Sequence, residues 1–417
     1  MKKILIILAV ISIWGSLGGC NKSSEAENKK KIKVGVLHSE TGSMATVERP
    51  VLAATLRAID AINQAGGILG RSVEAVVRDG RSDEKYFSQM AKELIEKEKV
   101  SAIFGCWTSS SRKAVKEVVE DYAHLLIYPL QYEGVEQSKY IFYIGMTANQ
   151  QIIPAIAWMI KQNGPKVYVV GSDYVFPRVA FEIIKDTLKS FDGQLVGSSF
   201  VPLGSKDVRQ PIDEIKKLKP DVILNLINGD TNLVFFSALR EQGITPDVIP
   251  TMSFSITEEE VRLLGHGSMV GDYTTWSYFQ SIKSKENVEF LDSLKQAINP
   301  ELKVFDPMES AFSGVRLWHQ AVVSAKSWQP EDVREALKGQ SLLAPSGVIY
   351  IDPNTQHAWR TIRIAQINNK GDFGVLWSSQ MPIEPVPFIS TRPKEQWSKL
   401  LENLFEGWGG QWSLKIQ

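Results

Sequence analysis

Short runs of β-branched and other apolar residues alternate with amphipathic stretches along the first half of the chain. Apolar positions at helical spacing fill the gaps between the runs. This alternation predicts a parallel sheet whose connecting helices cover it. The predicted strands are residues 33–37, 73–78, 102–106, 125–128 and 141–144, and the predicted helices are residues 51–64, 84–97 and 110–123.

A second alternating series follows, and two such series predict two similar lobes with a cleft between them. Its predicted helices are 151–162, 177–190, 208–217 and 231–242, and its strands are 166–171, 195–201 and 221–225. A sheet-like segment over 271–278 precedes further helices at 286–297, 308–326 and 330–337, and then strands at 347–351, 361–367 and 373–377. The late helices predict a return to the first lobe, and the late strands predict a second passage to the other lobe. We therefore assign residues 32–147 and 274–345 to lobe 1, and residues 148–273 and 346–385 to lobe 2.

Length and charge agree with two lobes and exclude some classes of function. The chain has 417 residues, and single cores stop growing near roughly 250–300 residues. Lys plus Arg equals Asp plus Glu, at 47 each, so the basic balance typical of a nucleic-acid binder is missing. Beyond residue 20 no apolar run approaches the roughly 20 residues that a membrane span needs.

The first 20 residues have the order of features found in a bacterial lipoprotein signal peptide. Lys2 and Lys3 precede the apolar run 4–14, and small residues follow up to Cys20. The ending Leu-Gly-Gly-Cys resembles a lipobox, in which Cys20 is acylated and becomes the mature N-terminus. An ordinary signal peptide is the alternative. Residues 21–31 are polar and charged, so we expect a flexible tether and an exported, lipid-anchored protein on the periplasmic or cell-surface face of a bacterial membrane. Cys106 then has no disulfide partner.

Residues just after the predicted strands carry the candidate chemistry, because ligands bind outside the carboxyl ends of parallel strands. Aromatic and neutral polar residues gather there: Trp107, Thr108, Ser109, Tyr128, Gln131, Tyr132, Tyr174, Phe176 and Asn228. Neither a P-loop nor a Gly-x-Gly-x-x-Gly pattern occurs, and no convergent cations are evident. Aromatic walls with a few polar groups are typical of a pocket for a small neutral molecule.

The sequence does not favour an enzyme. Gly-x-Ser-x-Gly and His-Glu-x-x-His are absent, and the five histidines are scattered without metal-ligand spacing. His38, Ser39 and Glu40 are adjacent, but neighbouring side chains of an extended segment point in opposite directions, so they form no triad. We expect no metal and no cofactor. An amide hydrolase, which would release ammonia, is the minor enzymatic alternative.

Several longer stretches resemble one family in order along the chain. They are Ser39–Gly42, Gly105–Val115, Tyr128–Gly134, Ala148–Gln151, Gly171–Arg178 and Asn228–Asp230. Over residues 32–385 the chain resembles the type I periplasmic solute-binding proteins, in the branch of urea-binding transporter components and short-chain amide sensors. The resemblance implies two Rossmann-like lobes with parallel sheets, joined by three crossover strands and closing on the ligand. It implies that Trp107, Ser109, Tyr128 and Tyr174 line the ligand, with Asn228 and Ser253 completing the pocket from lobe 2.

The ligand implied by the resemblance is a small amide. Trp107, Gln131 and the 228–230 turn resemble urea-binding members, whereas residues 39–42 and 48–49 resemble amide-sensing members. We expect an extracytoplasmic protein that captures urea, or acetamide or formamide, and delivers it to the subunits of an ABC permease. An input protein for a signalling system and a branched-chain amino-acid-type receptor are the alternatives. For an amino acid, Ser109–Ser111 would hold the carboxylate and Glu48 the ammonium group.

Two features lie outside this pattern. Residues 392–408 carry an amphipathic stripe with Trp397 and Trp408, which predicts a helix in the tail 386–417, either packed on a lobe or serving as a docking or membrane-contact element. Arg112 and Lys113 lie just inside a predicted helix, where we expect surface ion pairs.

Overall fold

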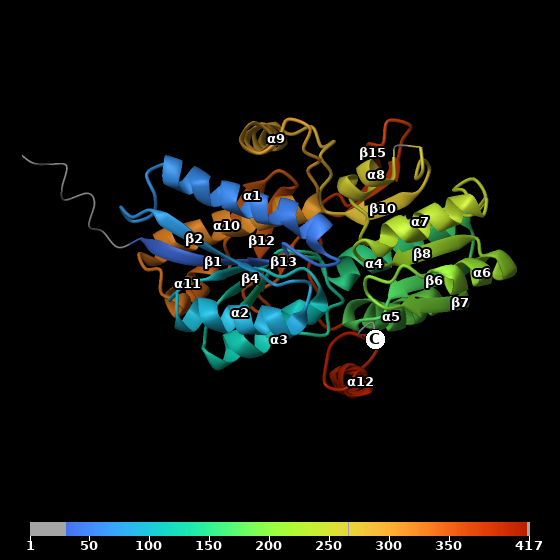
Figure 1. Cartoon of the computed structure of the whole chain (residues 1–417), viewed down its shortest axis with the longest axis horizontal. Coiled ribbons are helices and arrows are strands. Elements are labelled where there is room, and N and C mark those ends of the chain that lie inside the picture. The colour runs from blue at the N-terminus through green and yellow to red at the C-terminus, as the bar shows by residue number, and fades with distance from the viewer. Residues whose placement is uncertain (1–30, 266, 415–417) are drawn as a thin grey trace, which may run out of the picture.

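Two sheets, each covered by helices, form the two halves of the computed structural model, which describes residues 31–265 and 267–414 (Figure 1). The expected signal peptide, the acylated Cys20 and the tether up to residue 30 lie outside the described residues. Within the described part of the chain, no helix combines the length and apolar character of a membrane span.

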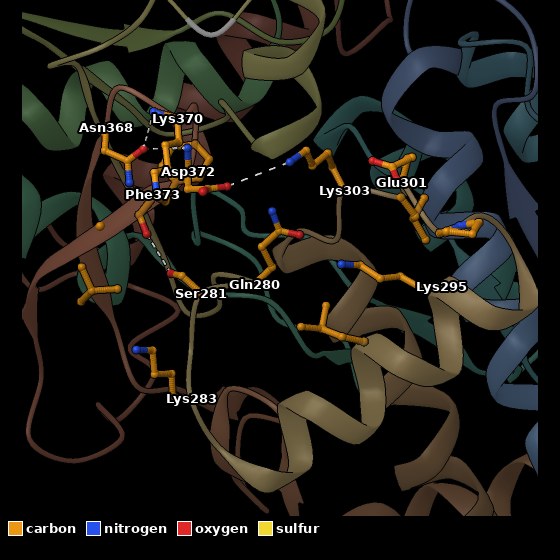
Figure 2. Close-up of a pocket in the computed structure, with 15 residues that line it drawn as sticks. Gln280, Ser281, Lys283, Lys295, Glu301, Lys303, Asn368, Lys370, Asp372 and Phe373 are labelled. Atoms are coloured by element: carbon orange, nitrogen blue, oxygen red, sulfur yellow. Dashed lines mark hydrogen bonds and ion pairs between the residues drawn. The ribbon is translucent and has the colours of Figure 1, made fainter.

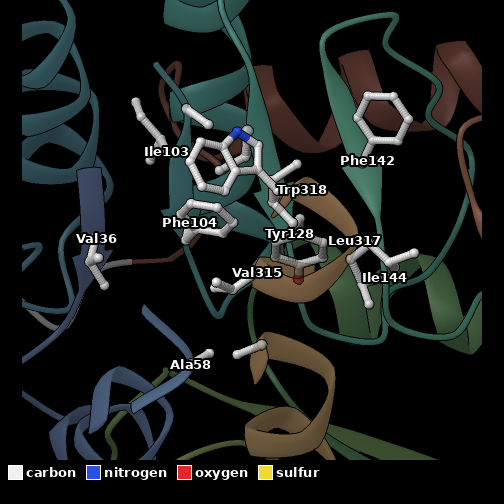
Figure 3. Packing of buried hydrophobic residues seen from close by; sticks show 14 of the residues in the cluster. Val36, Ala58, Ile103, Phe104, Tyr128, Phe142, Ile144, Val315, Leu317 and Trp318 are labelled. Carbon is white, nitrogen blue, oxygen red and sulfur yellow. The ribbon is translucent and has the colours of Figure 1, made fainter. Parts of the chain in front are cut away.

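The first sheet has five parallel strands in the order β2-β1-β3-β4-β5. They are β1 (Ile32–His38), β2 (Val73–Asp79), β3 (Ile103–Gly105), β4 (Leu126–Tyr128) and β5 (Ile141–Tyr143). Its helices are α1 (Ala45–Gln64), α2 (Glu84–Glu96), α3 (Ser109–Asp121), α9 (Lys285–Ala297), α10 (Asp306–Ala325) and α11 (Pro330–Leu337). Helix α10 packs on α1, β3 and β4. Figure 3 shows Trp318 of α10 against Phe104 of β3, with ring centroids 5.7 Å apart.

The second sheet has seven strands in the order β15-β14-β10-β9-β8-β6-β7. They are β6 (Lys166–Ser172), β7 (Gln194–Val201), β8 (Val222–Leu226), β9 (Thr251–Ser253), β10 (Tyr273–Trp276), β14 (Arg363–Ile367) and β15 (Phe373–Ser378). The helices of this half are α4 (Ala148–Asn163), α5 (Val175–Ser190), α6 (Arg209–Leu218), α7 (Thr231–Glu241), α8 (Glu258–Leu264) and α12 (Lys394–Gly407). The pairs β10–β14 and β14–β15 are antiparallel and the other neighbours are parallel, so the sheet is mixed where purely parallel strands were expected. A short turn joins β14 to β15, and such a turn can only connect antiparallel strands.

A third, small sheet moves one expected lobe boundary. Strands β11 (Ser341–Ala344), β12 (Gly347–Ile351) and β13 (Ala358–Trp359) form an antiparallel sheet. Ile349 and Ile351 are buried in the same core as β1 to β5. The chain therefore stays with the first half until after β13, and the boundary expected at residue 346 is too early. Alternation alone does not show which core a strand joins.

Three segments connect the halves, and one buried arginine joins two of them. Arg360, between β13 and β14, donates from Nη2 to Glu309 Oε2 on α10 (2.7 Å) and to Ser277 Oγ, which follows β10 (2.5 Å). The amide N–H of Ser277 donates to Asp306 of α10 (3.0 Å). All four residues are buried. We call Ser277, Asp306, Glu309 and Arg360 the hinge network; it ties two of the connecting segments to α10, since each buried charge needs its partner.

The His357 imidazole lies in a buried aromatic stack between the small sheet and β5. It stacks on Tyr143 with ring centroids 4.1 Å apart. Its Nδ1 lies 2.7 Å from the Thr355 carbonyl oxygen, which can only accept, so Nδ1 carries the proton and Nε2 faces the Tyr132 hydroxyl. Burial lowers the pKa of His357 from 6.5 to about 3.

Acid should therefore destabilise the protein through His357. The folded-state pKa is below the unfolded one, so this contribution is complete above about pH 6.5 and is lost as the pH falls toward 3. Between pH 6 and 4 we predict that the unfolding free energy of the native chain falls more steeply than that of a His357→Gln variant, by about 1.4 kcal/mol per pH unit. Guanidinium chloride titrations at several pH values measure both slopes. Equal slopes would show that His357 is not held neutral.

Candidate functional site

The two large sheets turn their strand-order reversals toward one another. In the first sheet the order reverses between β1 and β3, and in the second it reverses between β6 and β8. Loops diverge at such points and leave a crevice at the carboxyl ends of the strands. The facing loops touch: the Asp230 N–H donates to the Ser43 carbonyl (3.4 Å), and Gln131 Nε2 donates to the Phe254 carbonyl (3.1 Å). The structure therefore brings the two lobes into contact here, and we call the region between these facing loops, where a ligand is expected, the cleft.

A buried arginine organises the first-lobe side of the cleft. Arg112, on the first turn of α3, is fully buried and donates to Glu133 Oε1 (3.0 Å), Glu136 Oε1 (2.9 Å) and Ser109 Oγ (2.9 Å). Ser109 Oγ in turn donates to Glu133 Oε2 (2.5 Å). Lys113 Nζ completes the group at 2.8 Å from Glu136 Oε2. We call Arg112, Lys113, Glu133 and Glu136 the cleft network.

The network corrects one expectation from the sequence. Arg112 and Lys113 do form ion pairs, but both are buried and not on the surface. Burial alone would raise the pKa of Glu136, but Arg112 and Lys113 outweigh it and hold that pKa well below its ordinary value. The two cations and two carboxylates balance, so the group carries no net charge.

The loop after β3 is held by a helix cap and by a hydrogen bond from Tyr128 to its backbone. The Thr108 hydroxyl accepts from the Ser111 N–H (3.1 Å) and so caps α3. The Trp107 carbonyl accepts from the Tyr128 hydroxyl at the end of β4 (2.7 Å). Cys106 is buried and unpaired. Trp107, Thr108, Ser109 and Tyr128, all predicted ligand residues, thus share one corner of the cleft.

The second lobe contributes a facing wall after β6. Tyr174 is buried, and burial raises its pKa, with Tyr128 and Glu133 of the first lobe adding to the shift. Phe176 lies beside it, with ring centroids 6.2 Å apart. Helix α5, which begins directly after Tyr174, is in contact with α3 of the first lobe, so the two lobes meet near this point.

Other predicted residues make mainly internal contacts. Tyr132 directs its hydroxyl to His357 Nε2 and to the Glu136 carbonyl, and its ring lies 4.4 Å from the Arg112 guanidinium. Ser253 Oγ accepts from the Asn225 side chain (3.2 Å) within the second sheet. Asn228 follows β8, and its N–H donates to Ser172 Oγ (3.1 Å). For these three residues the structure shows contacts within the protein, and their role at a ligand stays a prediction.

One buried acceptor in the cleft has no partner. Gln131 donates its amide N–H to Phe254 across the lobes, while its Oε1 has no hydrogen bond within the described chain. A buried, unsatisfied carbonyl costs about 1–3 kcal/mol. An N–H donor from a small molecule would satisfy it.

Sequence reasoning missed Glu133, whose carboxylate lies beside Ser109 and is fully buried. The signal was present: an arginine one turn into α3 and two acids after β4 can meet where strands β3 and β4 are neighbours. Because Arg112 was expected on the surface, the need for a buried carboxylate partner such as Glu133 was not predicted.

A separate cavity lies far from these residues in sequence. It has a volume of about 720 Å³ and lies between α9 and the turn joining β14 to β15 (Figure 2). Lys283, Lys295, Lys303 and Lys370 line it, and Lys303 lies 4.0 Å from Asp372. None of the predicted ligand residues lines this cavity, and its lysines are at least partly exposed to water.

Several known proteins similar to this chain in sequence or structure are named as binding proteins. A family model described as a periplasmic binding protein domain matches residues 32–394. The chain is 26% identical over 392 residues to a Brucella melitensis protein named Leu/Ile/Val-binding protein homolog 6, covering 91% of this chain and 96% of that one. A Rhodopseudomonas palustris ABC-transporter solute-binding protein, solved with p-hydroxybenzoic acid, is 26% identical with a TM-score of 0.77, covering 85% and 98% of the two chains. A Streptococcus pneumoniae branched-chain amino-acid transporter protein, solved with isoleucine, is 21% identical with a TM-score of 0.74, covering 85% and 100%.

Removing the central cation should destabilise the first lobe strongly. Arg112→Met leaves Glu133 and Glu136 buried without their main partner, and breaking such a pair costs about 3–5 kcal/mol. Unfolding in guanidinium chloride measures the loss and avoids urea, which is a candidate ligand. Arg209→Met is the control, because it removes the well-exposed Arg209–Asp207 pair and should leave the transition in place. Equal transitions for the two variants would contradict the role given to the cleft network.

Proposed function

The chain belongs to the periplasmic binding protein family, and we propose that it captures a small neutral amide, with urea first, between its two lobes and delivers it to an ABC permease. The observation that carries this proposal is that the two buried cations beside the proposed site, Arg112 and Lys113, are already paired with protein carboxylates. The bound molecule would meet hydrogen-bonding groups and aromatic walls, and no bond would be made or broken.

The cleft network disfavours an anionic ligand. Arg112 and Lys113 form ion pairs with Glu133 and Glu136, so neither cation is free to bind a ligand carboxylate. An acid placed beside Ser109 would lie next to the Glu133 carboxylate, which repels it. A neutral molecule pays neither cost.

The available acceptors favour a ligand rich in N–H groups. Gln131 Oε1 has no partner within the described chain, and Glu133 accepts only, as every ionised carboxylate does. Urea carries two NH₂ groups and one carbonyl, so it can donate to both acceptors at once. Trp107 and Tyr174 would cover its faces and exclude water, while Tyr128, Phe176 and Asn228 shape the remaining walls.

A second candidate ligand comes from the relatives. The similar proteins are named for branched-chain amino acids or were solved with p-hydroxybenzoic acid or isoleucine. Glu48, the residue expected to hold an ammonium group, is buried and accepts from the Ser39 N–H (2.8 Å), so an amino acid would instead place its ammonium group on Glu133 and its carboxylate at the start of α3. A role as the input protein of a signalling system uses the same binding step, and gene neighbours encoding a sensor kinase instead of a permease would favour it.

Capture would work by closure of the lobes around the hinge network. A ligand that contacts both lobes binds the closed arrangement more tightly and so shifts the population toward it. We further propose that the protein acts outside the cytoplasmic membrane, held by lipid on Cys20. The permease would then bind the closed, ligand-loaded form.

Binding can be measured on the chain from Asn21 to Gln417. Isothermal titration with urea, acetamide, formamide, leucine, isoleucine and p-hydroxybenzoate should give saturable heat with urea, while an ammonia assay in the same cell stays blank. Trp107→Ala and Tyr174→Ala should each weaken urea binding more than tenfold, because each removes one wall of the site.

Trp328→Ala is the matched control for this titration. Trp328 stacks with Arg71 near the start of β2, at the edge of the sheet opposite the cleft. Its loss should leave urea binding unchanged. Heat from leucine or p-hydroxybenzoate without heat from urea would replace the amide proposal with the second candidate.

A further inference from the structure

We propose that residues 409–414 form a strap that joins the two lobes and stabilises their closed arrangement, with Trp412 as its central residue. This inference rests on the proposed capture by lobe closure. It gives the C-terminal tail a part in ligand affinity, where the sequence suggested only a packed helix or an external docking element.

The strap is bound to the second lobe through its backbone. The Val175 N–H donates to the Trp412 carbonyl (3.0 Å), and the Leu414 N–H donates to the Asp173 carbonyl (2.9 Å). Tyr174 and Ser413 thereby pair as an isolated antiparallel bridge. Val175 is the first residue of α5, whose N–H has no partner inside the helix. The strap therefore holds the segment that carries Tyr174, the proposed ligand wall.

The same residue contacts the first lobe. The backbone N–H of Trp412 is shared between the two Glu84 carboxylate oxygens, at 3.1 and 3.2 Å, on the first turn of α2. Lys113 of α3 places its ammonium 4.7 Å from the Trp412 ring centroid, a cation–π contact. Lys113 is also part of the cleft network through Glu136. Trp412 thus contacts α2 directly and is linked through Lys113 to the buried cleft network.

Helix α12 anchors the strap on the second lobe. Trp397 of α12 is buried in the core of the second half, and α12 packs on α5. Figure 1 shows α12 in red beneath the meeting point of the lobes, next to α5. Phe405 at the end of α12 supports the indole of Trp412, with ring centroids 4.7 Å apart.

Because the anchor lies on the second lobe, opening must separate Trp412 from Glu84 and Lys113. Only contacts that differ between the open and closed arrangements shift the balance between them. A hydrogen bond to a charged group and a cation–π contact are both of this kind here. Trp412→Ala removes the indole, and with it the cation–π contact and the packing on Phe405, whereas Glu84→Ala removes the acceptor of the backbone N–H. Either loss should weaken ligand affinity about tenfold, through faster dissociation.

The test compares Trp412→Ala with Trp408→Ala in the chain from Asn21 to Gln417. Trp408 packs against the core of the second half. Trp408→Ala therefore removes an indole of equal size from the same tail. Small-angle X-ray scattering without ligand should show a larger radius of gyration for Trp412→Ala and not for Trp408→Ala. Titration with urea, or with whichever solute of the panel binds the native chain, should show the tenfold loss for the same variant. Glu84→Ala removes the first-lobe partner and should reproduce both changes with the tail intact.

Each outcome is decisive. Scattering and affinity unchanged in both Trp412→Ala and Glu84→Ala would overturn the strap. Equal effects of Trp412→Ala and Trp408→Ala would also overturn it, because they would show general loosening of the tail. If the native chain bound no solute while Trp412→Ala still opened the ligand-free protein, the proposed function would fall and the strap would stand.

Discussion

The burial of Arg112 is the constraint on which the site depends. A guanidinium without exposure to water needs carboxylates, and Glu133 and Glu136 supply them from the loop after β4. That demand draws the loops after β3 and β4 together and orients Ser109. It also neutralises the cleft. The cation that could have held an anionic ligand instead builds the wall of the pocket.

Closure depends on contacts at three places around this wall. The hinge network around Arg360 joins two of the connecting segments to α10. Gln131 reaches across the cleft to Phe254, and the strap joins α5 to α2 and α3 at the edge. A ligand between the lobes adds to contacts that the protein already makes, so modest differences in binding energy can move the balance between open and closed forms.

The alternating pattern predicted the two α/β halves and most of their strands, because strands buried on both faces are near-continuous apolar runs. Helix starts were less predictable. Helix α1 begins at Ala45, six residues before the expected start, and contains Pro50. A proline is ordinarily found at a helix start and not inside one, so the local pattern favoured the later start. The resemblance and the strand ends predicted that Trp107, Ser109, Tyr128 and Tyr174 share one ligand site, and this stays a prediction. Arg112, Glu133 and Trp412 were missed because their roles arise from contacts between segments distant in sequence, which no local pattern records.

The most direct test of this account is a crystal structure of the protein grown with saturating urea. The account predicts closed lobes with urea between Trp107 and Tyr174, its N–H groups directed at Glu133 and Gln131. An empty cleft, or urea bound only in the lysine-lined cavity beside α9, would contradict it.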